Sequence, residues 1–125
     1  MSSDRQRVRG LRGAITVEAD TPGAIVGATV ELLEAMLERN GARTDDLISV
    51  VFTSTADLVS EFPAAAARQI GISEVPLLCA QEIPVPDSVP RCIRVLMHLY
   101  TERDYASLRH VYLRDARALR TDLPE

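Results

Sequence analysis

The stretch Asp20–Gly41 reads DTPGAIVGATVELLEAMLERNG and has the clearest helical pattern in the chain. Asp20-Thr21-Pro22 supplies a capping side chain followed by proline in the first turn, and Asn40-Gly41 supplies a stop about twenty residues later. Between these signals, core-compatible side chains recur at three- and four-residue steps, at Ile25, Thr29, Leu32, Leu33, Met36 and Leu37. This pattern predicts one long amphipathic helix.

Runs typical of β-strands lie on both sides of this helix. They cover Val8–Val17, Ile48–Thr53, Val75–Gln81, Cys92–Tyr100 and His110–Leu113. Gly10 and Gly13 interrupt the first run, which suggests bends or a close backbone approach there.

A second helix is expected from near Pro63 to Gln69, where the sequence is rich in alanine and is followed by Gly71. The segment Pro84–Pro90 contains three prolines in seven residues, so regular structure is not expected in it. This order of elements predicts an α/β or α+β domain, in which a mixed β-sheet carries its helices on one face.

Length and composition limit the domain organisation and the partners. The chain has 125 residues, of which 46% are hydrophobic, so we expect one domain over 8–125 with a real core, preceded by a mobile leader at 1–7. The residues from about Arg114 onward have no strong period and are expected to form a mobile tail. A net charge of −4 and an aromatic content of 4% argue against a nucleic-acid partner.

The polar segment Met1–Arg7 does not resemble a signal peptide, and no apolar run is long enough to span a bilayer. Two cysteines are too few for a disulfide scaffold, so we expect a cytoplasmic protein without a membrane partner. All 14 basic residues are arginines, so any carboxylate-binding site here must use guanidinium groups.

Cys79, Cys92, His98 and His110 are the candidates for a metal site. Their spacing gives neither a CxxC pair nor an HExxH helix, and buried thiols or hydrogen-bonded imidazoles explain them better. The chain also has no GxGxxG or Walker loop. We therefore expect neither a metal nor a cofactor.

Four motifs follow one another along the chain, namely VRGLRGA at 8–14, CAQE at 79–82, CIRV at 92–95 and RHVYL at 109–113. Together with Ala56–Leu58 and Phe62–Ala64, this ordered set resembles the AroH-class monofunctional chorismate mutases, from about Val8 to Leu123. The resemblance implies a trimeric pseudo-α/β-barrel whose active sites lie between neighbouring subunits. It also implies conversion of chorismate to prephenate, toward phenylalanine and tyrosine, without a cofactor.

The implied reaction is an intramolecular [3,3] rearrangement of a dianion, which requires positioning and electrostatic stabilisation but no nucleophile. Arg94 matches the family's cationic catalytic residue beside the ether oxygen. Glu82 matches the acidic catalytic residue that accepts a hydrogen bond from the ring hydroxyl. Without the resemblance, the sequence favours other interpretations, in which Arg94 is a strand arginine with a carboxylate partner and Glu82 is a solvated carboxylate at a strand end.

The resemblance also implies a set of substrate-binding residues. Arg12 and Tyr112 match groups that hold substrate carboxylates, and Cys79 matches a position that lines the site. Softer matches, to the rim and to a mobile tail that helps to cover the pocket, are Phe62, Arg68, Leu119 and Arg120. Where the family often has a basic residue, three positions before Arg68, this chain has alanine.

A different class of function also fits an arginine-lined barrel. A non-catalytic or deaminase-like trimeric barrel would bind a small carboxylate ligand with the same guanidinium groups. Glu82 together with Arg94 separates the two interpretations, because a carboxylate receptor has no reason to place an acidic group opposite its guanidinium.

Overall fold

A central strand organises the sheet in the computed structural model, which describes residues 6–119. The strands are β1 (Arg7–Thr16), β2 (Leu47–Ser54), β3 (Leu77–Gln81), β4 (Cys92–Thr101) and β5 (Val111–Leu113). The helices are α1 (Pro22–Arg39), α2 (Ala65–Gln69) and two short 3-10 helices, η2 (Thr44–Asp46) and η3 (Arg114–Leu119).

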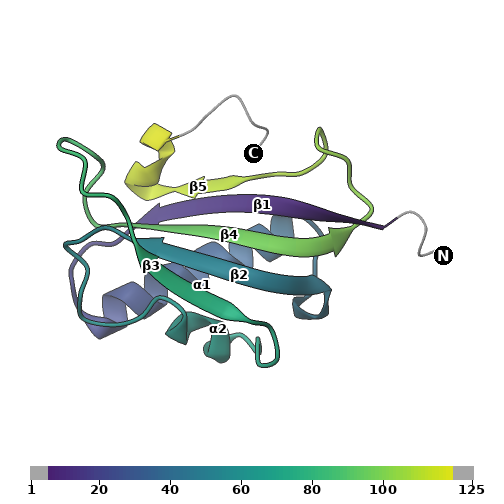
Figure 1. Ribbon diagram of the computed structural model, residues 1–125, viewed down its shortest axis with the longest axis horizontal. Helices are drawn as coiled ribbons and strands as arrows, with labels where there is room; N and C mark the ends of the chain where they lie inside the picture. Colours follow the sequence, from purple (N-terminus) through teal and green to yellow (C-terminus); the bar gives the residue numbers. More distant parts are fainter. Residues whose placement is uncertain (1–5, 120–125) are drawn as a thin grey trace.

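The five strands form one mixed sheet in the order β3-β2-β4-β1-β5 (Figure 1). The central strand, β4, pairs antiparallel with β1 and with β2. The outer strands run parallel to their neighbours, β5 to β1 and β3 to β2. The predicted mixed sheet is therefore confirmed.

Helix α1 begins and ends at the predicted signals. The Thr21 hydroxyl accepts a hydrogen bond from the Ala24 N–H at 3.1 Å, and Pro22 takes the first turn, where its missing N–H costs nothing. Asn40 caps the other end, and Gly41 follows with a φ of 59°, a left-handed conformation that glycine adopts without steric cost. The predicted apolar positions are all buried.

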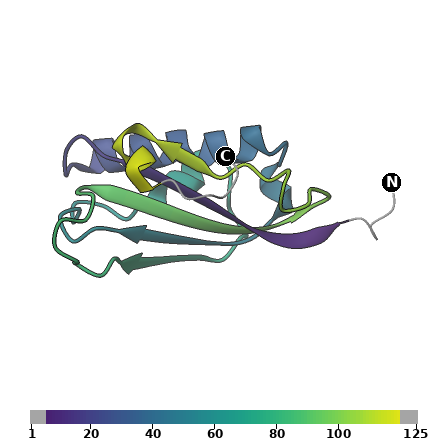
Figure 2. The same cartoon turned by 90° about the horizontal axis from the view of Figure 1, so that it is seen from above.

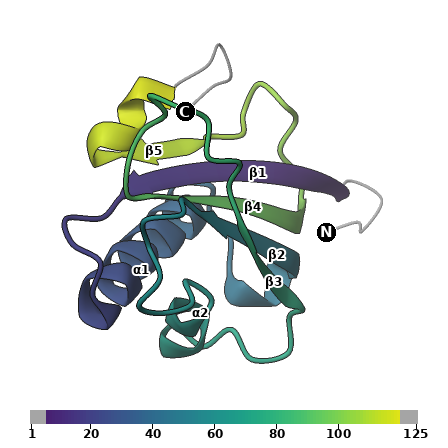
Figure 3. The ribbon, with the colours of Figure 1, turned by 60° about the vertical axis from the view of Figure 1, so that its left-hand side comes forward.

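Both α-helices cover the same face of the sheet (Figure 2). Along β4 the side chains alternate, so that Ile93, Val95, Met97 and Leu99 are buried under the helices. Arg94, Leu96, His98 and Tyr100 lie on the opposite face, which we call the open face. Part of that face, at the edge formed by β1 and β5, is covered by η3 and the chain around it (Figure 3), and Val89 from the loop before β4 packs there as well.

Gly13 allows α1 to pack closely on β1. A Cβ atom at this position would lie 2.5 Å from the Met36 sulfur and 3.1 Å from Leu32 Cδ1. The close approach suggested by the sequence therefore occurs at Gly13, and it is made by the core side chains of the helix.

The structure departs from the predicted elements by one or two residues at several strand and helix boundaries, and it departs from them in the tail. Strand β3 begins at Leu77 instead of Val75, because Pro76 has no N–H to give to a ladder, although its carbonyl accepts from the Val50 N–H at 3.1 Å. The tail forms η3, which its sequence pattern did not indicate. Strand β1 takes in Arg7, the last residue of the expected leader, and the rest of that leader falls mostly outside the described residues.

Candidate active site

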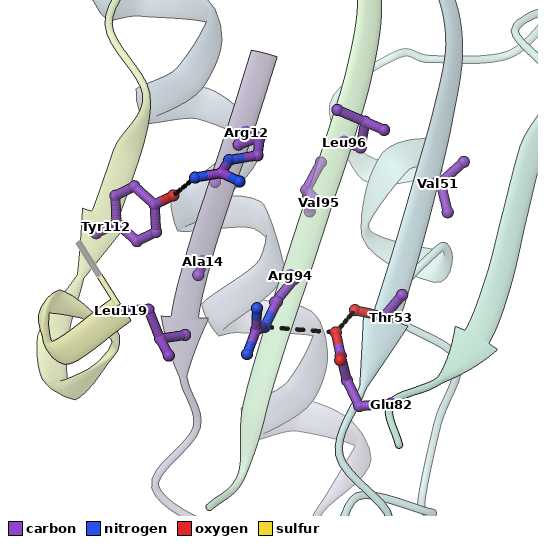
Figure 4. Close-up of a pocket in the computed structure, with 11 residues that line it drawn as sticks. Arg12, Ala14, Val51, Thr53, Glu82, Arg94, Val95, Leu96, Tyr112 and Leu119 are labelled. Atoms are coloured by element: carbon purple, nitrogen blue, oxygen red, sulfur yellow. Dashed lines mark hydrogen bonds and ion pairs between the residues drawn. The ribbon is translucent and has the colours of Figure 1, made fainter. Parts of the chain in front are cut away.

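Four strands and the η3 segment surround a cavity of about 320 Å³ on the open face (Figure 4). Its lining is mostly apolar, with two arginines, one carboxylate, one hydroxyl and one phenol directed toward it. The lining residues are Arg12, Gly13, Ala14, Val51, Thr53, Glu82, Arg94, Val95, Leu96, Tyr112 and Leu119.

Strand register brings these side chains together. Arg94 on β4 lies directly opposite Ala14 on β1 and Thr53 on β2, and two residues further along β4, Leu96 lies opposite Arg12. Since side chains two residues apart share a face of a strand, all of these point to the open face. The small side chain of Ala14 leaves room beside the Arg94 guanidinium.

Arg94 and Glu82 form an ion pair at the edge of the cavity. The Arg94 Nε lies 3.4 Å from the Glu82 Oε2, and the two side chains are 48% and 25% exposed. The Thr53 hydroxyl donates a short hydrogen bond to the same carboxylate oxygen. An ion pair this exposed to water contributes only about 0–1 kcal/mol to stability, so its value to the fold is small.

Arg12 and Tyr112 form the second polar group of the cavity. The Arg12 Nη2 donates to the phenol oxygen of Tyr112 at 3.0 Å, across the β1–β5 pair. The backbone N–H of Arg12 donates to Nδ1 of the buried His110 at 3.0 Å. Burial and the nearby Arg12 charge lower the pKa of His110, which keeps the imidazole neutral and able to accept.

Leu119 and Cys92 belong to a small apolar cluster beneath η3. The cluster consists of Ala14, Cys92, Tyr112 and Ala116, with Val89 and Leu119 packed against it. Burial raises the pKa of the Cys92 thiol to about 11, a shift that the Arg94 charge opposes and the Glu82 charge supports. The thiol is therefore protonated at neutral pH and is a poor nucleophile.

Three residues predicted for the site lie elsewhere in the protomer. Cys79 pairs in register with the buried Phe52 and packs on the helix side of the sheet. Cys79 and Phe62 line a separate cavity of about 310 Å³ beside β3. Arg68 is exposed in the last turn of α2, and Arg120 lies outside the described residues.

The structure therefore divides the predicted site residues into two groups. Arg94, Glu82, Arg12, Tyr112 and Leu119 line one cavity, whereas Cys79, Phe62 and Arg68 lie near the β3 edge of the sheet and helix α2. The two cavities have no lining residue in common.

Sequence reasoning missed one polar residue of the first cavity, Thr53. A threonine in a strand is ordinary, and nothing in the sequence gives its register against Arg94 or its contact with Glu82. The alternation of side chains along a strand shows which residues share a face with Arg94. It identifies Thr53 as a neighbour only when the pairing of β2 with β4 is already known.

The two histidines that were weighed and rejected as metal ligands have other partners. His98 Nδ1 lies 3.1 Å from the Ser49 hydroxyl, and His110 accepts from Arg12. Within the described ranges, no group of three or more His, Cys, Asp or Glu side chains is arranged to hold a metal ion. No helix among these residues is both long and apolar enough to cross a membrane.

Comparison with known proteins gives consistent matches along the chain. The family model for chorismate mutase type I matches residues 8–123. Over 117 residues the chain is 60% identical to chorismate mutase AroH of Thermus thermophilus, covering 93% of this chain and 96% of that protein. It is 41% identical to chorismate mutase AroH of Bacillus subtilis (strain 168) over 117 residues, covering 93% and 92% respectively.

A solved structure of a chorismate mutase from Clostridium thermocellum has the same fold. It superposes with a TM-score of 0.87 at 46% sequence identity, and the match covers 88% of this chain and 98% of that one. The resemblance inferred from the four sequence motifs is therefore confirmed.

Proposed function

The chain belongs to the chorismate mutase type I family and is an isomerase that converts chorismate to prephenate, and from this premise we propose that the Arg94 cavity is the catalytic half of its active site. Membership of this family favours the enzyme over the carboxylate-binding barrel that the arginines alone also suggest. The proposal rests on one observation, which is that Arg94 and Glu82 form an ion pair in the lining of a cavity that Arg12 and Tyr112 also line.

The chemistry requires little of the protein beyond geometry and charge. One C–O bond of the substrate breaks while one C–C bond forms within the same molecule, so no proton, electron or group leaves it. The enzyme must hold the enolpyruvyl side chain over the ring and stabilise the charge that separates as the C–O bond lengthens. A cavity with fixed charges at one end and apolar walls meets both needs.

In this mechanism Arg94 faces the ether oxygen. Negative charge grows on that oxygen along the reaction, so a fixed guanidinium binds the transition state more strongly than the ground state and raises kcat. Ala14 and Thr53 on the flanking strands fix the position of Arg94 in the sheet.

Glu82 accepts a hydrogen bond from the ring hydroxyl and lies toward the part of the transition state that loses electron density. Its position beside Arg94 gives the cavity a negative and a positive pole at short range. This arrangement suits the separated charges of the transition state better than the ground state, in which that charge separation has not yet developed.

Arg12 and Tyr112 bind a substrate carboxylate. The guanidinium offers paired N–H donors and the phenol offers one O–H donor, which together match two carboxylate oxygens. Their mutual hydrogen bond and the His110 contact hold the pair on adjacent strands before the ligand arrives.

We further propose that the active enzyme is a homotrimer with each site shared by two neighbours. The open face exposes apolar side chains that a lone protomer leaves in water, namely Val8, Leu78, Leu96 and Tyr100, at 53%, 62%, 36% and 49% exposure. Cys79, Phe62 and Arg68 would then supply the second half of each site from the neighbouring subunit.

We also propose a cytoplasmic location for the enzyme, because its two free thiols fit a reducing compartment.

Mixed trimers test the whole proposal. We expect Arg94→Ala to lower kcat about 100-fold or more, by analogy with the loss of one oxyanion donor, with the fold and the trimer intact. Arg68→Ala should weaken the half of the site that the neighbouring subunit supplies. Co-expressed Arg94→Ala and Arg68→Ala subunits, purified by two different tags, should regain activity because some sites receive both intact halves.

The matched control mixes Arg94→Ala with Arg12→Ala subunits. These two residues belong to the same half, so every site in the mixed trimers lacks one of them and activity should not return. Normal kcat in Arg94→Ala alone would reject the catalytic role. Equal activity in both mixtures would reject the shared site.

A further inference from the structure

We infer that Thr53 is a positioning residue for the reaction, acting through the carboxylate of Glu82. The inference rests on the proposed function of Arg94 and Glu82 and adds a residue to which no role has been assigned. It depends on three features of the described residues, which are the strand register around Thr53, the hydrogen bonds at Glu82 and the exposure of the site.

Register places Thr53 beneath Glu82. Thr53 lies between Arg94 of β4 and Ala80 of β3, and Glu82 follows Ala80 by two residues on the same side of the chain. The Glu82 N–H donates to the Ser54 carbonyl at 2.9 Å, which continues the parallel β2–β3 ladder by one residue beyond β3. The backbone thus brings the Glu82 side chain over the Thr53 hydroxyl (Figure 4).

The contacts of the Glu82 carboxylate fall on one of its two oxygens. A threonine hydroxyl has one proton, and Thr53 gives it to Oε2, the oxygen that also faces the Arg94 Nε at 3.4 Å. In the described part of the chain, Oε1 receives no hydrogen bond from the protein. One hydrogen bond and one ion pair on the same oxygen hold the carboxylate and leave the other oxygen to accept from a ligand hydroxyl.

This contact has more value for geometry than for stability. A glutamate side chain has three rotatable bonds, and at 25% exposure it would sample several rotamers if Arg94 alone held it through a water-exposed pair. The Thr53 hydroxyl comes from an interior strand, whose backbone is paired with β3 on one side and with β4 on the other. It therefore restricts Glu82 to the conformation that the reaction needs.

Removing the hydroxyl tests the inference. We expect Thr53→Val, which is close to threonine in shape, to lower kcat about 10-fold while KM changes by less than about 3-fold, because the lost order of Glu82 matters most in the transition state. Thr53→Ser keeps the donor and should restore kcat to within about 2-fold of the wild type. Thr53→Ala is the second variant without the hydroxyl and should repeat the loss if Thr53→Val folds poorly.

Ser49→Ala is the matched control. Ser49 lies on the same strand, its hydroxyl has its own side-chain partner in His98, and it does not line the cavity. A general effect of removing a β2 hydroxyl would lower kcat in this variant as well, and that result would overturn the inference. An unchanged kcat supports the specific role of Thr53.

A second comparison separates this inference from the proposed function. In a Glu82→Ala background there is no carboxylate to position, so adding Thr53→Val should leave kcat unchanged. If Thr53→Val lowers kcat by the same factor with and without Glu82, Thr53 acts in another way and the inference is wrong. If Glu82→Ala itself has normal kcat, the proposed catalytic role of Glu82 fails instead.

Discussion

The imidazole of His110 supports Arg12 only in its neutral form. Nδ1 accepts the hydrogen bond from the Arg12 N–H, and a protonated ring would present a donor there and a second positive charge beside the guanidinium. Burial first and the Arg12 charge second lower the pKa of His110. The geometry of the Arg12–Tyr112 pair is therefore linked to pH.

This linkage predicts how stability changes with pH. In the unfolded chain His110 binds a proton near the usual pKa of about 6.5, whereas the folded protein resists protonation, so the unfolded state binds more protons as the pH falls below that value. The stabilising contribution is present above pH about 6.5 and is lost as the pH falls through the folded-state pKa.

Urea unfolding at about pH 7.5 and about pH 5, at one fixed protein concentration, measures the effect. The free energy of unfolding should fall more in the wild type than in His110→Gln, which keeps an acceptor but does not titrate. Equal losses in the two proteins would contradict the linkage. The other titratable groups are the same in the two proteins, so their contribution cancels when the two losses of unfolding free energy are compared.

Single residues also show where sequence reasoning reached its limit. Arg94 and Glu82 were identified through their motifs, and the structure brings them to 3.4 Å. Thr53 was missed because its role depends on contacts across two strand pairs, and sequence order does not reveal strand pairing. A local sequence pattern gives the type of each side chain. It does not show which residues, far away in the sequence, lie close to that side chain in the fold.

At the scale of elements, the packing of α1 on β1 depends on the absence of a side chain at Gly13. A Cβ atom there would lie 2.5 Å from the sulfur of Met36, which is fully buried, so the methionine side chain would have to shift. We expect Gly13→Ala to destabilise the protein by about 1 kcal/mol. Overpacking of the core outweighs the entropy that alanine removes from the unfolded chain, and the flexible methionine limits the cost.

Gly10→Ala is the matched control on the same strand. A Cβ atom at Gly10 would meet its nearest neighbour, Leu96 Cδ1, at 3.6 Å, which is an ordinary contact. Thermal unfolding should therefore show a lower Tm for Gly13→Ala than for Gly10→Ala. A Tm for Gly13→Ala equal to or above that of its control would mean that the helix does not depend on this close approach.

The elements themselves were largely predictable, because their signals are local. Thr21, Pro22 and Asn40 determine the ends of α1 through capping and proline geometry, and the β-branched runs give most of β2 and β4. Helix η3 was not predicted. It is held by contacts that are distant in sequence, such as the Asp115 N–H donating to the Thr16 hydroxyl at 3.2 Å.

At the scale of the whole molecule, residues predicted for the site line two separate cavities of one protomer. Cys79 on the edge strand β3 and Phe62 line one cavity, and the Arg94 cavity lies over the central strands with η3 beside it. Sequence patterns could not divide the predicted residues in this way, because the division follows from which face each strand presents. The shared site of the proposed trimer gives both groups a role in one reaction.

The central claim is that Arg94 faces the oxygen whose bond breaks. A crystal structure of the enzyme with a non-reactive substrate analogue that keeps the bridging ether oxygen tests this claim directly. We predict that a guanidinium nitrogen of Arg94 lies about 2.7–3.2 Å from that oxygen. A guanidinium turned away from the oxygen, with no other cation in its place, would contradict the account.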